Sequence, residues 1–371
     1  LMSFAARPNP ARRSTRFTAV ALGLAITLTG VACSSDSTSS GDDGSSATTS
    51  VASAVGEDEV LAIDEPAIQQ TLDETAQSLL LPGVMVLIKT PDGTHRLSTG
   101  TTTLGEQIAP TAGTSFRIGS VTKTMTSAVI LQMVSEGKVA LDDPIDRYVA
   151  AVPDGATITI AQLLEMRSGL HNYLDTPGFK TTFGADPTHL WTPQQLIDLG
   201  FAEPMSFEPG GGYDYSNTNT VLLGIVAEQI DQQPLAAIYA ERLFEPLGME
   251  DTFLPDPTTF GLPDPSSRGY QYGPLQVSDA TLTPEEQAAA EAGTLQPNDV
   301  TDQSPSWSWA AGGVVSTADD LAVWIEELNR GSVLDDATHQ LWEDSLEVMH
   351  EEDPKALYGY GIGQIRFGAN R

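Results

Sequence analysis

A long apolar run from Val121 to Val134 carries a single charge, on Lys123. Because the run is hydrophobic nearly all round and not along one stripe, it predicts a helix buried at the centre of the fold. Gly137 suits the left-handed conformation that closes helices, and Pro144 cannot continue one. The pattern therefore predicts a central helix that ends shortly after Val134.

Two further patterns precede this helix. Apolar positions over 58–79 recur with helical spacing, which predicts an amphipathic helix. The residues on its apolar side are Val60, Ile63, Ile68 and Leu72. The stretch 83–100, GVMVLIKTPDGTHRLSTG, predicts two strands joined by a turn at Pro91-Asp92-Gly93.

The rest of the chain mixes short helices with loops rich in proline and glycine. Helices are predicted at 158–166, 192–201, 218–230, 283–293 and 316–331. Ser316 or Thr317 is expected to cap the last of these. The closing segment 357–371 has the composition of a strand. Strands near both ends, with helices between them, predict an α+β fold whose sheet is assembled from distant segments.

The N-terminal segment has the layout of a secretory signal. Its positive charges are Arg7, Arg12, Arg13 and Arg16. They precede 17–33, FTAVALGLAITLTGVAC, which is uncharged and shorter than the roughly 20 residues of a membrane-spanning helix. We therefore expect 1–33 to be a signal peptide and the protein to be extracytoplasmic.

Cys33 is the only cysteine of the chain, so it forms no internal disulfide. Its position at the end of the apolar run resembles a bacterial lipoprotein signal, in which this cysteine becomes the lipidated first residue. Gly30 departs from that pattern, which usually has leucine there. The resemblance implies a membrane lipoprotein held by its lipid anchor only, and a simply cleaved signal of a secreted protein is the alternative.

Residues 34–56 contain mainly Ser, Thr, Gly and Asp, which predicts a disordered linker, so the globular domain is expected at 57–371. The whole chain of 371 residues has 18 basic and 50 acidic residues, a net charge of −32. Such a surface repels phosphate backbones, which excludes nucleic acid as a partner. The acidic excess suits a salty medium and suits general solubility equally well.

The pattern Ser-x-x-Lys occurs twice, as Ser120–Lys123 and as Ser135–Lys138. Ser120 precedes the central helix, where serine is a favoured cap and where the positive end of the helix dipole favours an oxyanion. Burial of Lys123 requires a partner or a lowered pKa, and a neutral lysine can take the serine proton. Ser135 and Lys138 lie at the other helix end, near backbone carbonyls, so the second pair is rejected.

Tyr215-Ser216-Asn217 is the only Tyr-x-Asn in the chain and follows three glycines, 210–212. A phenol beside an ammonium can become a phenolate and relay a proton, and the amide of Asn217 can orient a substrate carbonyl or Lys123. Taken alone, the same residues read as a core tyrosine and a helix cap.

Together these motifs resemble the serine penicillin-recognising family of β-lactamases, D-alanyl-D-alanine carboxypeptidases and related esterases. Further matching stretches follow in the family's order: FRIGSVTKTMTSAVILQMVSEGKVALDDPIDRYV, LLEMRSGL, YSNTNTVLLGIVAEQI, ERLFEPLGMEDTFL and AAGGVVSTADDLAVWIEEL. The resemblance implies a β-lactamase-like fold, an antiparallel sheet flanked by helices plus a mostly helical subdomain. It implies that Ser120 is the acylated nucleophile and Lys123 its proton partner. Tyr215 is then the base or relay, and Asn217 contacts the substrate amide.

Two departures accompany the resemblance. Glu165-Met166-Arg167 stands where His-Thr is common in the family. The family's third element, His-Thr-Gly or Lys-Thr-Gly, is absent from the sequence. The sequence therefore predicts a domain that is incomplete at its C-terminus, with C-terminal strands missing and an open sheet edge.

The leading hypothesis is an extracytoplasmic serine hydrolase that forms an acyl-enzyme with D-alanyl-D-alanine peptides, β-lactams or related esters. The alternative is a non-catalytic surface lipoprotein that keeps the fold for binding. No cofactor is expected. The histidines are scattered without the spacing of metal ligands, which argues against a metalloenzyme; they are His95, His171, His189, His339 and His350.

Overall fold

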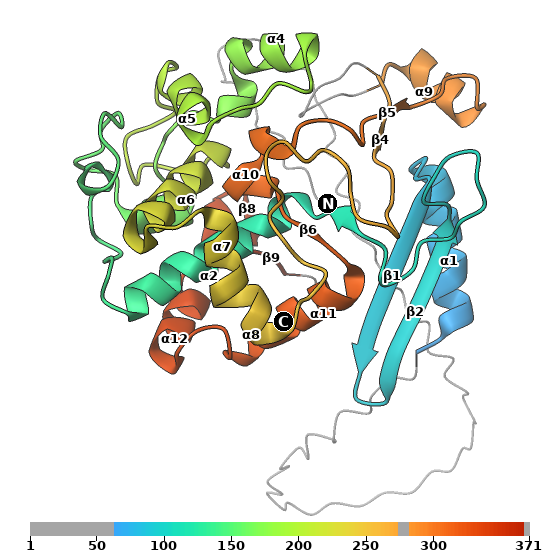
Figure 1. The fold of residues 1–371 in the computed structure, drawn as a ribbon, viewed down its shortest axis with the longest axis horizontal. Coiled ribbons are helices and arrows are strands. Elements are labelled where there is room, and N and C mark those ends of the chain that lie inside the picture. Colours follow the sequence, from blue (N-terminus) through green and yellow to red (C-terminus); the bar gives the residue numbers. More distant parts are fainter. Residues whose placement is uncertain (1–62, 274–281, 367–371) are drawn as a thin grey trace, which may run out of the picture. The chain divides into compact units, whose positions relative to one another are not determined.

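The computed structural model describes residues 63–273 and 282–366 (Figure 1). The expected signal peptide, the linker at 34–56 and Cys33 lie outside these residues. Within them the structure is α+β, as the sequence predicted. Every pairing between its strands is antiparallel. No helix of the described part of the chain is long and apolar enough to cross a membrane.

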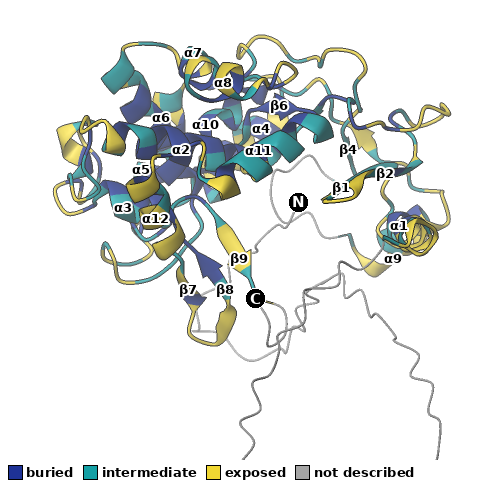
Figure 2. Ribbon diagram, turned by 90° about the horizontal axis from the view of Figure 1, so that it is seen from below, coloured by how far each residue is buried: buried dark blue, intermediate teal, exposed yellow. Residues whose placement is uncertain are grey.

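The predicted central helix is present as α2, Thr122–Ser135, and it is buried along most of its length. It packs against α6 (Asn217–Asp231), α7 (Leu235–Tyr239), α10 (Trp309–Gly312) and α12 (Asp336–Asp344). Figure 2 shows α2, α6 and α10 as adjoining buried elements. The sequence produces this arrangement because α2 has apolar residues on every face, and each face therefore meets another element.

The front hairpin is also confirmed. Strands β1 (Gly83–Thr90) and β2 (Gly93–Gly100) pair in register, with Thr90 opposite Gly93 at the turn. Helix α1 (Glu65–Ser78) packs on β2, and α11 (Ala318–Arg330) packs on β1, so helices flank the hairpin (Figure 1).

Helix α1 spans Glu65–Ser78. The sequence predicted a helix from residue 58, and this is wrong for Ile63 and Asp64, which are described and lie before the helix. The reason is local. The Asp64 side chain accepts a hydrogen bond from the Ala67 N–H and caps the helix, and Pro66 follows in its first turn.

The remaining strands are short. Strand β3 (Phe116–Arg117) pairs with β6 (Val315–Ser316), and β4 (Tyr270–Gln271) pairs with β5 (Asn298–Asp299). Within the described residues, strands from distant segments of the chain therefore pair over two residues only. The longest pairing, between β1 and β2, joins neighbouring segments.

A three-stranded sheet closes the described residues, formed by β7 (Glu347–His350), β8 (Asp353–Tyr358) and β9 (Gly363–Ile365). The continuous strand predicted from 357 is wrong, because the chain turns between β8 and β9. Gly361 adopts a positive φ of 76° in that turn, a conformation that favours glycine.

The predicted helices between these strands form, several of them shorter than expected. Capping boxes at Thr159, Thr192 and Thr283 start three of them. The helices not yet named are α3 (Ile160–Leu164), α4 (Pro177–Ala185), α5 (Pro193–Phe201), α8 (Glu245–Leu247) and α9 (Pro284–Glu291). Single turns and a π-helical segment complete the set: η1 (Gly119–Val121), η2 (Ile145–Arg147), η3 (Tyr173–Asp175), η4 (Ala240–Phe244) and η5 (Pro305–Trp307).

Candidate active site

Ser120 lies in η1, the single turn that leads into α2, and its side chain is exposed. The expectation that Ser120 caps the central helix is wrong. The capping position of α2 is Val121, and neither η1 nor α2 has a side-chain capping bond. Because η1 extends the helix upstream, the Ser120 hydroxyl is left to face Lys123, whose Nζ lies 3.2 Å from Oγ.

Lys123 is only 2% exposed, yet its amine has three hydrogen-bond acceptors. Nζ donates to Asn217 Oδ1 and to the Ala311 carbonyl oxygen, each at 2.7 Å, besides Ser120 Oγ at 3.2 Å. All three acceptors are neutral, so no charge compensates for burial. Burial therefore lowers the pKa of Lys123 to about 7.

These contacts satisfy both protonation states of Lys123. An ammonium donates to all three acceptors, whereas a neutral amine has two N–H donors and one lone pair. The Asn217 and Ala311 carbonyl oxygens can only accept, so they take the two N–H groups. The lone pair is then directed at Ser120 Oγ, which is the geometry of a base for that hydroxyl.

Tyr215 lies two residues before the first residue of α6, and its phenol is half-buried. Lys123 Nζ lies 4.8 Å from the centre of its ring. Burial raises the pKa of Tyr215 to about 12, and a hydrogen bond with Ser120 opposes that rise. The group is therefore a protonated phenol at neutral pH, in contact with the serine and beside the lysine.

Asn217 is the first residue of α6 and is buried. Its Oδ1 accepts from Lys123, and its Nδ2 donates to Asn172 Oδ1 at 3.2 Å. Both ends of this amide are thus engaged within the protein. The expected contact between Asn217 and a substrate amide stays a prediction, while its contact with Lys123 is seen directly.

The four motif residues of the sequence thus meet in one place. The profile of the Beta-lactamase family matches residues 68–364. The chain belongs to the beta-lactamase family. This match spans the elements that carry Ser120, Lys123, Tyr215 and Asn217.

Two relatives whose names give different activities, an esterase and a carboxypeptidase, share this family resemblance. Esterase EstB of Burkholderia gladioli is 31% identical over 231 residues, 58% of this chain and 57% of the esterase. The D-alanyl-D-alanine-carboxypeptidase/endopeptidase AmpH of Escherichia coli is 28% identical over 246 residues, 64% of this chain and 55% of AmpH. The chain therefore spans little more than half of the length of these relatives.

A solved structure extends the comparison to three dimensions. The D-stereospecific amidohydrolase of a Streptomyces species matches with a TM-score of 0.69 and 28% identity. The match covers 81% of this chain and 83% of that one, so most of the beta-lactamase-family fold is shared between them.

Two members of the site in this beta-lactamase-family chain escaped the sequence motifs, namely Ala311 and Asn172. Ala311 acts through its backbone carbonyl, so its side chain carries no signal. The two glycines that follow are the only trace, since a Cβ on Gly313 would approach the Trp309 carbonyl oxygen to 2.8 Å. A second hydrogen bond from α2 holds α10 in place: Thr126 Oγ1 donates to the Ala310 carbonyl oxygen at 2.7 Å.

The two tryptophans of the stretch 306–313, SWSWAAGG, pack against other parts of the fold. Trp307 meets Phe183 edge-on, with ring centres 5.9 Å apart, and its carbonyl oxygen accepts from the Tyr173 hydroxyl. Trp309 lies against Gly224 of α6, where a Cβ would meet its ring at 2.9 Å. Neither contact involves Ser120 or Lys123.

The second Ser-x-x-Lys pair has the surface role expected of it. Lys138 is exposed and forms ion pairs with Glu136 at 2.7 Å and Asp231 at 3.0 Å. Ser135 donates a hydrogen bond to Asp335 and has no contact with Lys138 of the kind seen in the first pair. Gly137 closes the helix with a φ of 69°.

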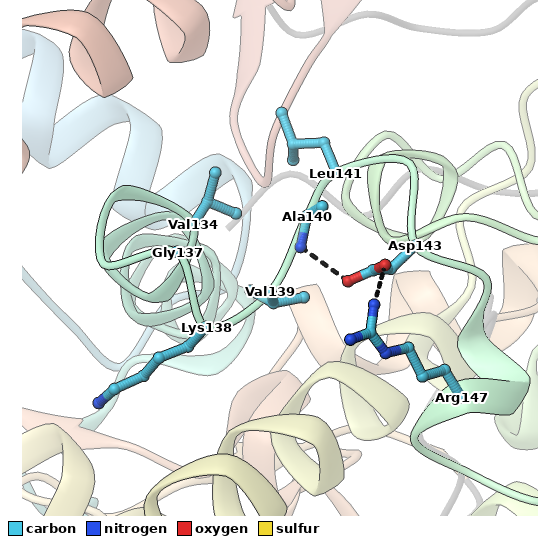
Figure 3. A pocket seen from close by; sticks show the side chains of 8 residues that line it. All are labelled: Val134, Gly137, Lys138, Val139, Ala140, Leu141, Asp143 and Arg147. Atoms are coloured by element: carbon cyan, nitrogen blue, oxygen red, sulfur yellow. Dashed lines mark hydrogen bonds and ion pairs between the residues drawn. The ribbon is translucent and has the colours of Figure 1, made fainter.

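An open pocket of about 340 Å³ lies beside Lys138, at the opposite end of α2 from Ser120 (Figure 3). Its charged members are already paired, since Asp143 accepts from the Ala140 N–H and from Arg147. The Lys138 amine points away from that pair. Nothing in its lining combines a nucleophile with a base, so the pocket is not the active site. Among the described residues, no three His, Cys, Asp or Glu side chains gather as a metal-binding group.

Proposed function

We propose that this protein is a serine hydrolase that forms an acyl-enzyme on Ser120. The observation that carries the proposal is the environment of Lys123. Its amine is buried, donates to two carbonyl oxygens and lies within hydrogen-bond distance of the exposed Ser120 hydroxyl. A lysine in such surroundings is held for proton transfer and not for an ion pair.

In the first half of the reaction, neutral Lys123 takes the proton of Ser120, and Oγ forms a bond to the substrate carbonyl carbon. The tetrahedral intermediate collapses when the leaving amine or alkoxide departs. Its proton comes from the Lys123 ammonium, relayed through the Tyr215 phenol that contacts Ser120. The phenol is a relay here, because its pKa of about 12 leaves little phenolate at neutral pH.

In the second half, water attacks the acyl carbon and gives up a proton to the same Lys123 and Tyr215 pair. The acyl–Oγ bond breaks, the product leaves as a carboxylic acid, and Ser120 regains its proton. Over both halves, one amide or ester and one water become an acid and an amine or alcohol.

The substrate class we propose is a peptide or other acyl compound with an amide or ester bond, and D-alanyl-D-alanine peptides of the peptidoglycan type in the first place. The relatives that support this range are an esterase, a carboxypeptidase and a D-stereospecific amidohydrolase. We also propose an extracytoplasmic place of action, on the strength of the arginine-led apolar segment that ends at Cys33.

The test is turnover of three compounds by the purified protein: a D-alanyl-D-alanine peptide, p-nitrophenyl butyrate and a chromogenic β-lactam. We expect at least one to be hydrolysed, and the rate to fall to background in Ser120→Ala. A binding protein without catalysis would turn over none of them, and activity that persists in Ser120→Ala would rule out the proposed nucleophile.

A further inference from the structure

Asn172, in the loop before η3, contacts the active-site residues although it belongs to none of the motifs. Its Oδ1 accepts two hydrogen bonds from Asn217, one from the backbone N–H and one from Nδ2, each at 3.2 Å. Its own Nδ2 donates to Asp175 Oδ2 at 2.9 Å. A continuous chain of bonds thus runs from Asp175 through Asn172 and Asn217 to Lys123.

The orientation of the two side-chain amides in this series of hydrogen bonds is fixed by neighbouring groups that can only donate or only accept. A backbone N–H can only donate, and an ionised carboxylate can only accept. Asn172 must therefore turn its oxygen toward the Asn217 N–H and its NH₂ group toward Asp175. That oxygen in turn attracts Nδ2 of Asn217, so Asn217 presents its own oxygen to Lys123.

The opposite orientation of Asn217 would be costly. Its NH₂ group would then face the Lys123 amine, and two donors would oppose each other where the lysine is only 2% exposed. Lys123 would lose one of the two carbonyl acceptors that direct its lone pair toward Ser120.

The loop that carries Asn172 is fastened to α6 on both sides of that residue. Thr218 Oγ1 donates to the His171 carbonyl oxygen at 2.6 Å and accepts from the Tyr173 N–H at 3.1 Å. Asp175 is paired in addition with Lys180, at 3.6 Å. Asn172 is therefore held opposite the first residue of α6 by contacts that do not involve the reactive groups.

We propose that Asn172, supported by Asp175, is a positioning residue of the active site, which sets the orientation of the Asn217 amide and thereby directs Lys123 toward Ser120. Its kinetic consequence rests on the proposed function. The bond chain itself is a property of the folded protein, so it is testable without turnover.

Three variants test the inference. Asn172→Leu removes both acceptor bonds at similar volume. Asn172→Asp alone places two carboxylates, at positions 172 and 175, within hydrogen-bond distance of each other. Adding Asp175→Asn exchanges the amide and the carboxylate, so that every hydrogen bond from position 175 to Asn217 can form again. Asn329→Leu is the matched control: within the described part of the chain, the Asn329 side chain bonds only the Ile325 carbonyl oxygen, on the exposed side of α11.

Two readouts are needed. The first is the pKa of Lys123, from ¹³Cε NMR of lysine, which is practicable because the chain has five lysines: Lys89, Lys123, Lys138, Lys180 and Lys355. The second is the rate of acylation by p-nitrophenyl butyrate between pH 6 and 9. Tyr215, the titratable side chain whose ring faces Lys123, is unchanged in every variant.

We expect Asn172→Leu to lower the pKa of Lys123, because a carbonyl oxygen that faced the ammonium is lost. We expect it to slow acylation by about 10- to 100-fold at pH 9, through misdirection of the lone pair. The double exchange should recover most of that rate and Asn172→Asp alone should not, so the exchange decides the question even where Asn172→Leu fails to fold.

An unchanged Lys123 pKa in folded Asn172→Leu would overturn the inference, as would a double exchange that is no faster than Asn172→Asp alone. If the wild-type protein is not acylated at all, the proposed function fails. The NMR titration then still decides the positioning role, because it needs no substrate.

Discussion

At the scale of single residues, Lys123 and Lys138 show how surroundings decide chemistry. Each follows a serine by three positions, but Lys123 is buried among neutral acceptors, and burial lowers its pKa to about 7. Lys138 lies at the surface, where Glu136 first and then Asp231 raise its pKa. Only Lys123 is partly neutral near pH 7, so only Lys123 can accept the proton of its serine.

The pH dependence of acylation follows from this. Below its pKa Lys123 is an ammonium without a lone pair, so the acylation rate should rise with pH through about 7. One protonation step centred there gives about a tenfold gain between pH 6 and pH 8. The measurement is the rate of acylation by p-nitrophenyl butyrate. Lys138→Met should leave the profile unchanged, and a rate that first rises near pH 10 would contradict the account.

Two neighbouring tyrosines offer a matched comparison. Tyr215→Phe keeps the ring beside Lys123 but removes the relay hydroxyl, and we expect kcat to fall by about 10²- to 10⁴-fold with the fold intact. Tyr213 has a buried hydroxyl that finds no hydrogen-bond partner among the described residues, so Tyr213→Phe should keep full activity and equal or greater stability. Equal kcat in the two variants would exclude a relay at Tyr215.

The sequence predicted the site as far as its side chains carry a pattern. Ser120, Lys123, Tyr215 and Asn217 were singled out, and the structure brings them together. Ala311 could not be found, since any residue supplies a backbone carbonyl.

Asn172 escaped for a different reason. Its contact with Asn217 spans 45 positions in the sequence, and the loop that makes it has no repeated pattern. A role that depends on tertiary contact between a loop and the first residue of a distant helix leaves no local trace.

At the scale of elements, the turn between β8 and β9 supports the base of the active site. Gly361 donates its N–H to the Leu164 carbonyl oxygen at 3.1 Å and lies against α2. A Cβ there would collide with the Ser127 side chain and come within 3.1 Å of the Lys123 carbonyl oxygen. The turn therefore packs directly on the segment of α2 that holds the lysine.

Gly361→Ala tests this contact. The new methyl group collides with α2, and the positive φ of 76° disfavours any residue with a Cβ, so we expect about 2–4 kcal/mol of lost stability. Urea unfolding followed by circular dichroism measures it. Gly363→Ala is the control, because its nearest neighbour lies 3.7 Å away, and it should stay within about 0.5 kcal/mol. Equal stability of both variants would refute this packing.

Long periodic segments were predicted well and short ones poorly. Helix α2 and the β1–β2 hairpin formed as expected, because their patterns extend over many residues. Helix α4 was missed: its nine residues, PGFKTTFGA, include two glycines and two threonines, and buried Phe179 and Phe183 hold it in place. Tertiary contacts of this kind override weak local preference.

At the scale of the whole molecule, the family match and the expected signal segment lie in different parts of the chain. The match covers 68–364, whereas the apolar run with Cys33 precedes it. The strongly acidic balance, −32 overall, disfavours nucleic acid as a partner.

Lipidation is the prediction that belongs to this scale. Expressed in a bacterial host with radiolabelled palmitate, the wild-type protein should incorporate label and fractionate with the membrane. Cys33→Ser removes the only thiol of the chain and should abolish both. Label retained in Cys33→Ser, or a wild-type protein released without label, would exclude the lipoprotein.

The central claim is that Ser120 carries the acyl group, and mass spectrometry of the trapped intermediate tests it most directly. The purified protein is incubated with a fluorescent penicillin or p-nitrophenyl butyrate, quenched in acid and digested, and the modified peptide is sequenced. We expect an adduct on Ser120 that is absent from Ser120→Ala and strongly reduced in Lys123→Met. An adduct on another residue, or one that survives Ser120→Ala, would contradict this assignment.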